Sequence, residues 1–281
     1  MNNSMRIQVL NEDIRLRPSS IDGFFQCSYQ WGKVFLEGIT TIPSARAAIG
    51  TSIHKGVEVM WQEAMKAGEA NPNKAMMVDA AMGAWKEEGQ KGIQFDEDEN
   101  DRTAAVEIIK GMEAFVEDIV PFTQIPTGVE ERFTVKLDHQ LVKEISGTVD
   151  YITDTTIADV KTSKRKPSVA NYTTQQSLYK YLAVSNGRKV SASLIQGVVL
   201  KAKPEGMILP ADIDVEQAKG LVNIMLDTLD LVMLDKAPIE SILRPNPKYY
   251  LCDKKYCKLY GNCPATSTKS TKAVKSYGVK I

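Results

Sequence analysis

Apolar residues in the N-terminal part of the chain recur every three or four positions, which is the spacing of one buried helix face. This spacing predicts a first helix with its N-cap at Ser19 or Ser20, running through Trp31 with Cys27 inside it. Three further helices are predicted at residues 44–66, 73–91 and 103–119. We therefore expect residues 18–125 to form a mainly helical lobe.

The hydrophobic period changes at Val129, where apolar and polar residues begin to alternate. The alternation predicts a strand at 129–137, followed by two shorter strands at 147–152 and 157–162 that a polar turn joins. A helix at 171–185, a strand at 192–200 and a helix at 214–234 follow. This order predicts a single α/β domain over residues 1–264, with its sheet core at 126–200.

The stretches between and beyond these elements are polar. Residues 1–17 are expected to be a lead-in, and the acidic residues 96–101 a solvated loop. Residues 201–264 combine the last helix with a cysteine-rich end. Residues 265–281 contain no acid and are expected to be a flexible basic tail, with its charge on Lys269, Lys272, Lys275 and Lys280.

The composition is that of an ordinary globular protein, with 281 residues, 43% hydrophobic and 25% charged. The 35 basic and 35 acidic residues cancel, so the chain as a whole has no polyanion-binding signature, although a local basic surface would suffice for nucleic acid. No apolar run approaches the roughly 20 residues of a membrane span, and no signal peptide opens the chain. We expect a cytoplasmic protein with no membrane partner.

The two short predicted strands carry three charged residues that converge if the strands pair. Side chains alternate across a strand, so Asp159 and Lys161 point to the same face. Strand pairing would bring Asp150 beside them. Buried charges must pair with each other or hold a metal. Taken alone, the segment indicates either a surface salt bridge on an edge hairpin or a metal site.

The four cysteines are unevenly placed, with Cys27 near the start and Cys252, Cys257 and Cys263 close together near the end. In a reducing cytosol this pattern indicates a metal or cluster site more than disulfides. A zinc site usually has two pairs of closely spaced cysteines, which this spacing lacks. The cysteines therefore favour a [4Fe–4S] cluster, with structural Zn²⁺ as the second candidate.

Five motifs in order give the chain a family resemblance over about residues 18–264. They are Gly50–His54, Gly147–Asp150, Asp159–Lys161, Gln175–Tyr179 and the four cysteines. The set resembles the RecB-like nucleases of the PD-(D/E)xK superfamily, with cysteines similar to those of the Cas4-like and AddB branches. The resemblance implies a restriction-endonuclease-like core, in which helices flank a mixed central sheet, with a C-terminal cysteine cluster.

The resemblance also implies roles for the motif residues. Asp150 and Asp159 would bind Mg²⁺ or Mn²⁺ through hard oxygen atoms, together with the Val160 backbone carbonyl and His54. Lys161 would hold the attacking water and offset the phosphate charge. Alone, His54 is more readily explained as a histidine at the edge of the core.

Two more motif residues, Gln175 and Tyr179, lie four apart on one helix face and would line the active site. For Tyr179, a simple aromatic core contact remains open. Glu130 resembles an auxiliary acid of some relatives, but an exposed glutamate at the strand end is the simpler account. The cysteine cluster would clamp the N-terminal helix to the C-terminal segment without taking part in hydrolysis.

The function implied is a metal-dependent DNA exonuclease of recombination, repair or replication, either phage-type or CRISPR-associated. Its substrate would be single-stranded DNA or duplex ends, contacted by Lys164, Arg165 and Lys166 and by the basic tail. The alternative is a catalytically silent DNA-binding module that the cluster stabilises. A homo-oligomer and partner proteins of recombination or CRISPR adaptation remain open.

Overall fold

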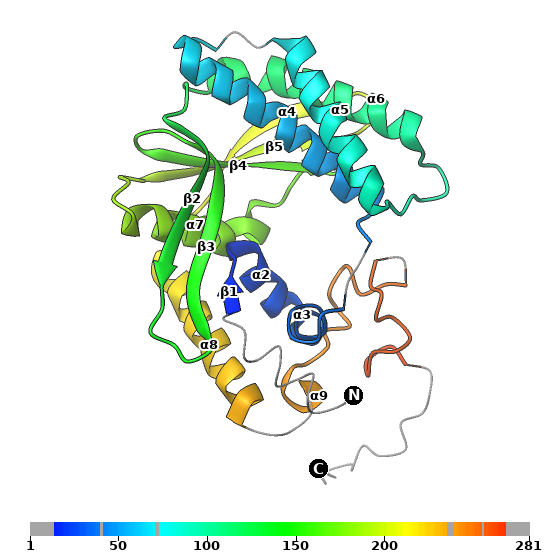
Figure 1. Ribbon diagram of the computed structural model, residues 1–281, viewed down its shortest axis with the longest axis vertical. Coiled ribbons are helices and arrows are strands. Elements are labelled where there is room, and N and C mark those ends of the chain that lie inside the picture. The colour runs from blue at the N-terminus through cyan, green and yellow to red at the C-terminus, as the bar shows by residue number, and fades with distance from the viewer. Residues whose placement is uncertain (1–13, 40–41, 71–72, 235–238, 255, 268–281) are drawn as a thin grey trace.

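A mixed sheet separates two groups of helices in the computed structural model (Figure 1). The structure describes residues 14–39, 42–70, 73–234, 239–254 and 256–267. Two hydrophobic cores lie on the two sides of the sheet. The predicted α/β architecture, with helices flanking a mixed central sheet, is therefore confirmed.

The strands of the described residues pair in the order β1-β3-β4-β5-β6, and β2 pairs with β3 off this path. Strands β1 and β3 are parallel, as are β4 and β5, whereas the other pairs are antiparallel. The strands are β1 Ile14–Leu16, β2 Gly128–Lys136, β3 Val142–Ile152, β4 Thr156–Ser163, β5 Ala192–Val199 and β6 Glu205–Pro210.

Strand β3 is paired along most of one edge and is interrupted on the other. Along the first edge it pairs with β2 between Glu144 and Ile152, and Asp150 is omitted from the register. On the other edge, β1 pairs with residues 142–145, and β4 pairs with Tyr151 and Ile152 alone. Within the described residues, positions 146–150 therefore face a gap between β1 and β4.

One helical layer covers one face of the sheet, where it packs mainly over β4, β5 and β6 (Figure 1). Its helices are α4 Ala45–Ala67, α5 Lys74–Lys91 and α6 Asp101–Asp118, with the short 3₁₀ helix η1 Val120–Phe122 after α6. Each helix begins after a side-chain cap, from Ser44, Asn73 and Asn100 respectively. The layer buries Ile53, Trp61 and Phe115 against the sheet.

The second layer packs on the opposite side of the sheet and combines helices from the start of the chain with helices from its end. Its elements are α2 Pro18–Gln26, α3 Ser28–Phe35, the 3₁₀ helix η2 Val169–Tyr172, α7 Thr173–Ser185, α8 Val215–Leu234 and α9 Ile239–Ile242. Ile21, Leu178 and Met225 share its core. The helices near the start of the chain therefore lie beside those near its end (Figure 1).

The prediction of one continuous first helix was wrong. The chain turns at Cys27, which has φ −157° and ψ 88° and separates α2 from α3. The N-cap was also misplaced, because Arg17 holds that position and Pro18 supplies the first helical residue. Ser20 is the third helical residue, and its hydroxyl accepts a bond from the Arg17 N–H at 3.1 Å.

Two polar stretches, the lead-in and the acidic stretch, are also more structured than the sequence suggested. Residues 14–16 of the expected lead-in form β1, and the predicted elements omit β6. In the acidic stretch, the Glu99 side chain is only 8% exposed and lies 2.6 Å from Arg46 Nη2. Asp101 begins α6. The expected basic tail lies outside the described residues from 268 onward.

In the described part of the chain, no helix is both long enough and apolar enough to span a membrane.

Two motif glycines mark places where a helix approaches the sheet too closely for a side chain. A Cβ on Gly50 of α4 would lie 2.8 Å from Thr162 Oγ1 of β4. A Cβ on Gly147 of β3 would lie 2.8 Å from Tyr179 Cε1 of α7. These glycines therefore set the distances at which α4 and α7 hold their polar residues over the sheet.

Replacing Gly50 by alanine is expected to destabilise the protein by about 1–3 kcal/mol. The new methyl group would meet Thr162, whose β-branched side chain has few alternative rotamers. Thermal unfolding of Gly50→Ala measures the effect, with Gly89→Ala as the matched control. Gly89 lies in α5 with nothing within 4 Å of an added Cβ, so its replacement should be neutral or stabilising. Equal melting temperatures for wild type and Gly50→Ala would contradict the close-packing account.

Candidate active site

The gap beside β3 ends where β3 and β4 separate, and Asp150 occupies this point. The two strands pair at Tyr151–Ala158 and Ile152–Ile157, next to the turn, and then diverge. Asp150 lies one residue beyond the last pair, and its Oδ2 accepts a hydrogen bond from the Val160 N–H at 2.8 Å. A carboxylate thus takes the place of a backbone acceptor, which fixes Asp150 against the edge of β4.

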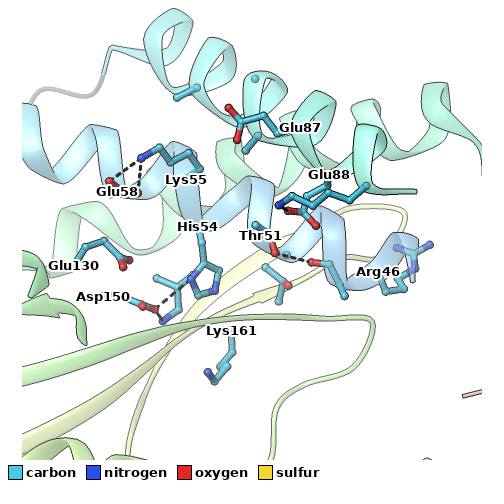
Figure 2. Close-up of a pocket in the computed structure, with 18 residues that line it drawn as sticks. Arg46, Thr51, His54, Lys55, Glu58, Glu87, Glu88, Glu130, Asp150 and Lys161 are labelled. Carbon is cyan, nitrogen blue, oxygen red and sulfur yellow. Dashed lines mark hydrogen bonds and ion pairs between the residues drawn. The ribbon is translucent and has the colours of Figure 1, made fainter. Parts of the chain in front are cut away.

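Helix α4 directs His54 onto the same point (Figure 2). His54 Nδ1 lies 3.3 Å from Asp150 Oδ2, and the ring also bonds to the Val160 backbone. Burial lowers the pKa of His54, against the opposing influence of Asp159. The imidazole is therefore neutral at pH 7, which is the form that binds a metal ion. His54, Asp150 and the Val160 backbone meet from three different elements.

The predicted convergence of Asp159 and Lys161 is present in the structure. Lys161 Nζ lies 2.5 Å from Asp159 Oδ2, and the Asp159 side chain is only 4% exposed. Burial alone would lower the pKa of Lys161, but Asp159 and then Asp150 outweigh it, so the pKa is raised. Lys161 is therefore a cation at neutral pH, and its ammonium also lies 5.4 Å from the centre of the Tyr172 ring.

The carboxylates around Asp150 repel one another. Burial, followed by the nearby Asp159, raises the pKa of Asp150 to about 7. Glu58, one helical turn after His54, contributes to the same increase and has a side chain only 18% exposed. Excess negative charge of this kind, in a partly buried site, is what a bound cation would relieve.

The expectation that Glu130 is an exposed strand-end residue was wrong. Glu130 is half-buried and lines the same cleft as His54 and Asp150 (Figure 2). Its φ is +50°, a left-handed conformation that is uncommon for a residue with a side chain. Burial, followed by Asp150 and Glu58, raises the pKa of Glu130 to about 7. Local strain and charge repulsion thus coincide at this position.

Replacing Glu130 by glutamine is expected to raise the melting temperature of metal-free protein by about 2–4 °C above pH 7. The folded state holds the Glu130 proton up to about pH 7, whereas the unfolded chain releases it near pH 4.5. Folding is therefore penalised increasingly as the pH rises between these values, and the substitution removes that penalty. Melting curves of both proteins in EDTA at pH 5 and pH 8 test this. The exposed Glu216→Gln is the control, and a gain of equal size at both pH values would contradict the repulsion.

Gln175 and Tyr179 lie on the same face of α7, as their spacing predicted. The Gln175 side-chain amide donates to the Tyr179 hydroxyl at 3.2 Å, and the exposed fractions are 6% and 8%. Tyr179 belongs to the core between α7 and the sheet. Burial, then Asp159 and Asp150, raise the pKa of Tyr179, so its hydroxyl stays protonated at neutral pH.

Asp22 of α2 is a neighbour of the site that the sequence analysis missed. Burial raises its pKa to about 6, while Lys161 and a hydrogen bond from Thr174 oppose the increase. Asp22 therefore places a carboxyl group near Lys161 on the side of α2 and α7. Its position among the apolar residues of a predicted helix carried no signal of that role.

The site opens into a cleft of about 890 Å³ between α4, α5 and the separated strands. The carboxylates, imidazole and backbone carbonyl at its base are chemically suited to Mg²⁺ or Mn²⁺. Among the described residues, no three His, Cys, Asp or Glu side chains are already arranged to hold an ion. In this arrangement Lys161 forms an ion pair with Asp159.

Cys27 precedes the other three cysteines by more than 200 residues in sequence. All four nevertheless line one small cavity between the α2–α3 turn and the C-terminal segment. No disulfide joins any of the four. Bonds from Ser28 and Tyr29 to the Arg244 carbonyl hold the two chain segments together. Burial, followed by the other cysteines, raises the pKa of Cys252. Four converging sulfur atoms are chemically suited to a cluster or to zinc, although they too lack a coordinating arrangement.

The basic residues after β4 are exposed, as a contact with DNA requires. Lys164, Arg165 and Lys166 directly follow the strand that carries Asp159 and Lys161. Lys164 Nζ lies 3.9 Å from Glu99, while its side chain remains 60% exposed.

Comparisons with known proteins agree with this geometry. The family model described as the PD-(D/E)XK nuclease superfamily matches residues 15–264. A crystal structure from Eubacterium rectale, described as that of a candidate exonuclease, aligns over 89% of this chain and 90% of its own, with 13% identity and a TM-score of 0.58. A structure named SSO0001 aligns over 94% and 96% with 12% identity, but its TM-score is 0.38. No curated protein matches. The Eubacterium rectale structure thus supports the fold.

Proposed function

Because the chain belongs to the PD-(D/E)XK nuclease superfamily, we propose that it is a metal-dependent DNA exonuclease. The observation that carries this proposal is the meeting of His54, Asp150, Asp159 and Lys161 where β3 and β4 separate. A surface salt bridge would not need the additional histidine and carboxylates that line the same cleft. We place the activity in DNA recombination, repair or replication, either phage-type or CRISPR-associated.

Asp150, Asp159, His54 and the Val160 carbonyl would hold the divalent cation. When bound, Mg²⁺ or Mn²⁺ would lower the pKa of water and offset negative charge on the phosphate. The Val160 N–H keeps one oxygen of Asp150 fixed, so the carboxylate needs little reorganisation. Glu58 and Glu130 add negative charge that favours retention of a cation.

Lys161 has a different part in this proposal. It is protonated and paired with Asp159, so it would direct N–H groups toward the scissile phosphate and the attacking water. The ammonium lies 5.4 Å from the centre of the Tyr172 ring, and its charge acts on Asp22. Lys164, Arg165 and Lys166 would contact DNA phosphates without reading sequence.

For the cysteines we propose a structural role, with Cys27, Cys252, Cys257 and Cys263 as ligands of a [4Fe–4S] cluster. Their common cavity supports a four-sulfur site, and zinc is the second candidate. The site would join the α2–α3 turn to the C-terminal segment.

Digestion of linear and circular single-stranded DNA of equal length tests the exonuclease proposal. With Mg²⁺ or Mn²⁺, the linear strand should shorten from an end while the circle stays intact, and EDTA should stop the reaction. Cutting of both at equal rates would identify an endonuclease. If no metal supports digestion of either, a DNA-binding module would replace the nuclease.

A further inference from the structure

Residues 244–264, the segment that carries three of the cysteines, combine positive charge with tyrosines. The segment contains five basic residues and one acid, Asp253. The basic residues are Arg244, Lys248, Lys254, Lys255 and Lys258, and the tyrosines are Tyr249, Tyr250, Tyr256 and Tyr260. A chain with no net charge overall thus concentrates positive charge next to its cysteines. Basic and aromatic residues alternating in this way are typical of surfaces that bind single-stranded nucleic acid.

The segment turns its cysteines inward and most of its tyrosines outward. The segment contains tight turns, such as the one closed by the hydrogen bond from the Cys252 N–H to the Tyr249 carbonyl at 2.7 Å. Such turns let side chains a few residues apart point in opposite directions. Tyr249 lines the cysteine cavity, whereas Tyr250 is 73% exposed. Tyr256 and Tyr260 are also exposed, at 53% and 42%. The ring of Tyr250, which lies in water rather than in the core, is available to a ligand.

Tyr250 pairs with the tyrosine beside it, and its charge acts on a tyrosine next to Lys161. The Tyr249 and Tyr250 ring centres are 4.9 Å apart at 75°. Tyr250 and Asp159 both raise the pKa of Tyr172, after burial and against Lys161. The ring of Tyr172 is in turn 5.4 Å from the Lys161 ammonium. Tyr250 is an exposed ring of the cysteine-bearing segment, and that segment lies beside α3 (Figure 1).

The exposed lysines of the segment leave its charge available to a polyanion. Lys248, Lys254 and Lys258 are exposed and make no ion pair with any described residue. Phosphate groups of a strand lying across Tyr250 would meet this positive charge.

We propose that Tyr250 is a stacking site for an unpaired base of the DNA strand that enters the active site. The bases of a duplex cover one another, so only a single strand or an opened end presents a free base face. The substrate class is therefore single-stranded DNA ends, and this inference rests on the nuclease function proposed above. Lysines of the segment hold the phosphates while the tyrosine holds the base.

The test compares two oligonucleotides of equal length, one of thymidines and one of abasic sites. Both carry the same phosphate charge, and only the first can stack. Binding is measured by fluorescence anisotropy in EDTA, so that no cleavage occurs. Wild type should bind the thymidine strand about 5- to 30-fold more tightly. Tyr250→Ala should remove this preference, and Tyr250→Phe should retain it. Phe122→Ala, which removes a 78% exposed ring after α6, is the matched control.

Tyr250 is too exposed for its truncation to leave a core cavity, and Tyr250→Leu repeats the test with the side-chain volume retained. Equal wild-type affinity for both strands, no binding of either, or a preference that survives Tyr250→Ala would each overturn the stacking site. Cleavage of the thymidine strand with Mn²⁺ is measured in parallel. Cleavage without a base preference defeats the stacking site alone, whereas absence of cleavage by wild type defeats the proposed nuclease.

Discussion

Replacing Lys161 by alanine is expected to slow DNA hydrolysis by about 10²–10³-fold. The Lys161 ammonium forms an ion pair with Asp159, at 2.5 Å. Its loss would remove the group that offsets phosphate charge and orients water. The measurement is a single-turnover time course on end-labelled single-stranded DNA. Lys164→Ala, three residues further along, should change binding more than the hydrolysis rate.

The same substitution should also lower the melting temperature in EDTA, because it leaves Asp159 buried without its partner. A divalent cation should restore part of the loss by taking the place of the ammonium. Lys161→Arg keeps the charge and serves as the control for stability. Wild-type hydrolysis by Lys161→Ala would contradict the role assigned to this residue.

Replacing Cys257 by alanine is expected to lower the melting temperature by about 10 °C or more. The cysteines lie on segments that are far apart in sequence, so loss of a cluster or metal bound between them would release the C-terminal segment from the α2–α3 turn. Hydrolysis per folded molecule should change less than stability. Differential scanning calorimetry measures the first effect, with Lys258→Ala as the control on an exposed neighbour.

Metal analysis of the same preparation identifies the ligand. Anaerobically purified wild type should contain iron and sulfide and absorb broadly near ~400 nm. A colourless protein with stoichiometric zinc would show that the cysteines bind zinc and not an iron–sulfur cluster. Equal melting temperatures for wild type and Cys257→Ala would contradict a structural site of either kind.

The periodicity of the sequence predicted most of the architecture. Helical spacing located α4, α5 and α6 to within a few residues, because each buries residues three or four positions apart and has a side-chain cap. Alternation located β2 and placed Asp159 and Lys161 on one face. The strands β1 and β6 are short or only partly buried, so alternation gave no distinct signal for them.

The finer geometry of the site depends on tertiary structure. The separation of β3 from β4, which gives Asp150 its bond to Val160, leaves no mark on local periodicity. The left-handed φ of Glu130 is equally invisible, because the residue is not a glycine. Glu58 could have been found, since it lies one helical turn after His54 on the same face. Asp22 could not, because its relevance arises only when α2 packs beside α7.

The cysteines illustrate both sides of this division. Their number and spacing predicted that Cys27 would join Cys252, Cys257 and Cys263, and the structure places all four around one cavity. Placing Cys27 within a helix was wrong because sequence patterns did not reveal the backbone break at that residue. The break also turns α3 so that Ser28 bonds to the Arg244 carbonyl.

The central claim is that His54, Asp150, Asp159 and Lys161 form a metal-dependent site for phosphodiester hydrolysis. It is tested most directly by the hydrolysis rate of end-labelled DNA as Mn²⁺ is added to EDTA-treated wild type and to Asp150→Asn. We predict a rate that rises and saturates with Mn²⁺ for wild type and stays about 10³-fold lower for Asp150→Asn. A wild-type rate that is independent of Mn²⁺, or an equal rate for Asp150→Asn, would contradict the account.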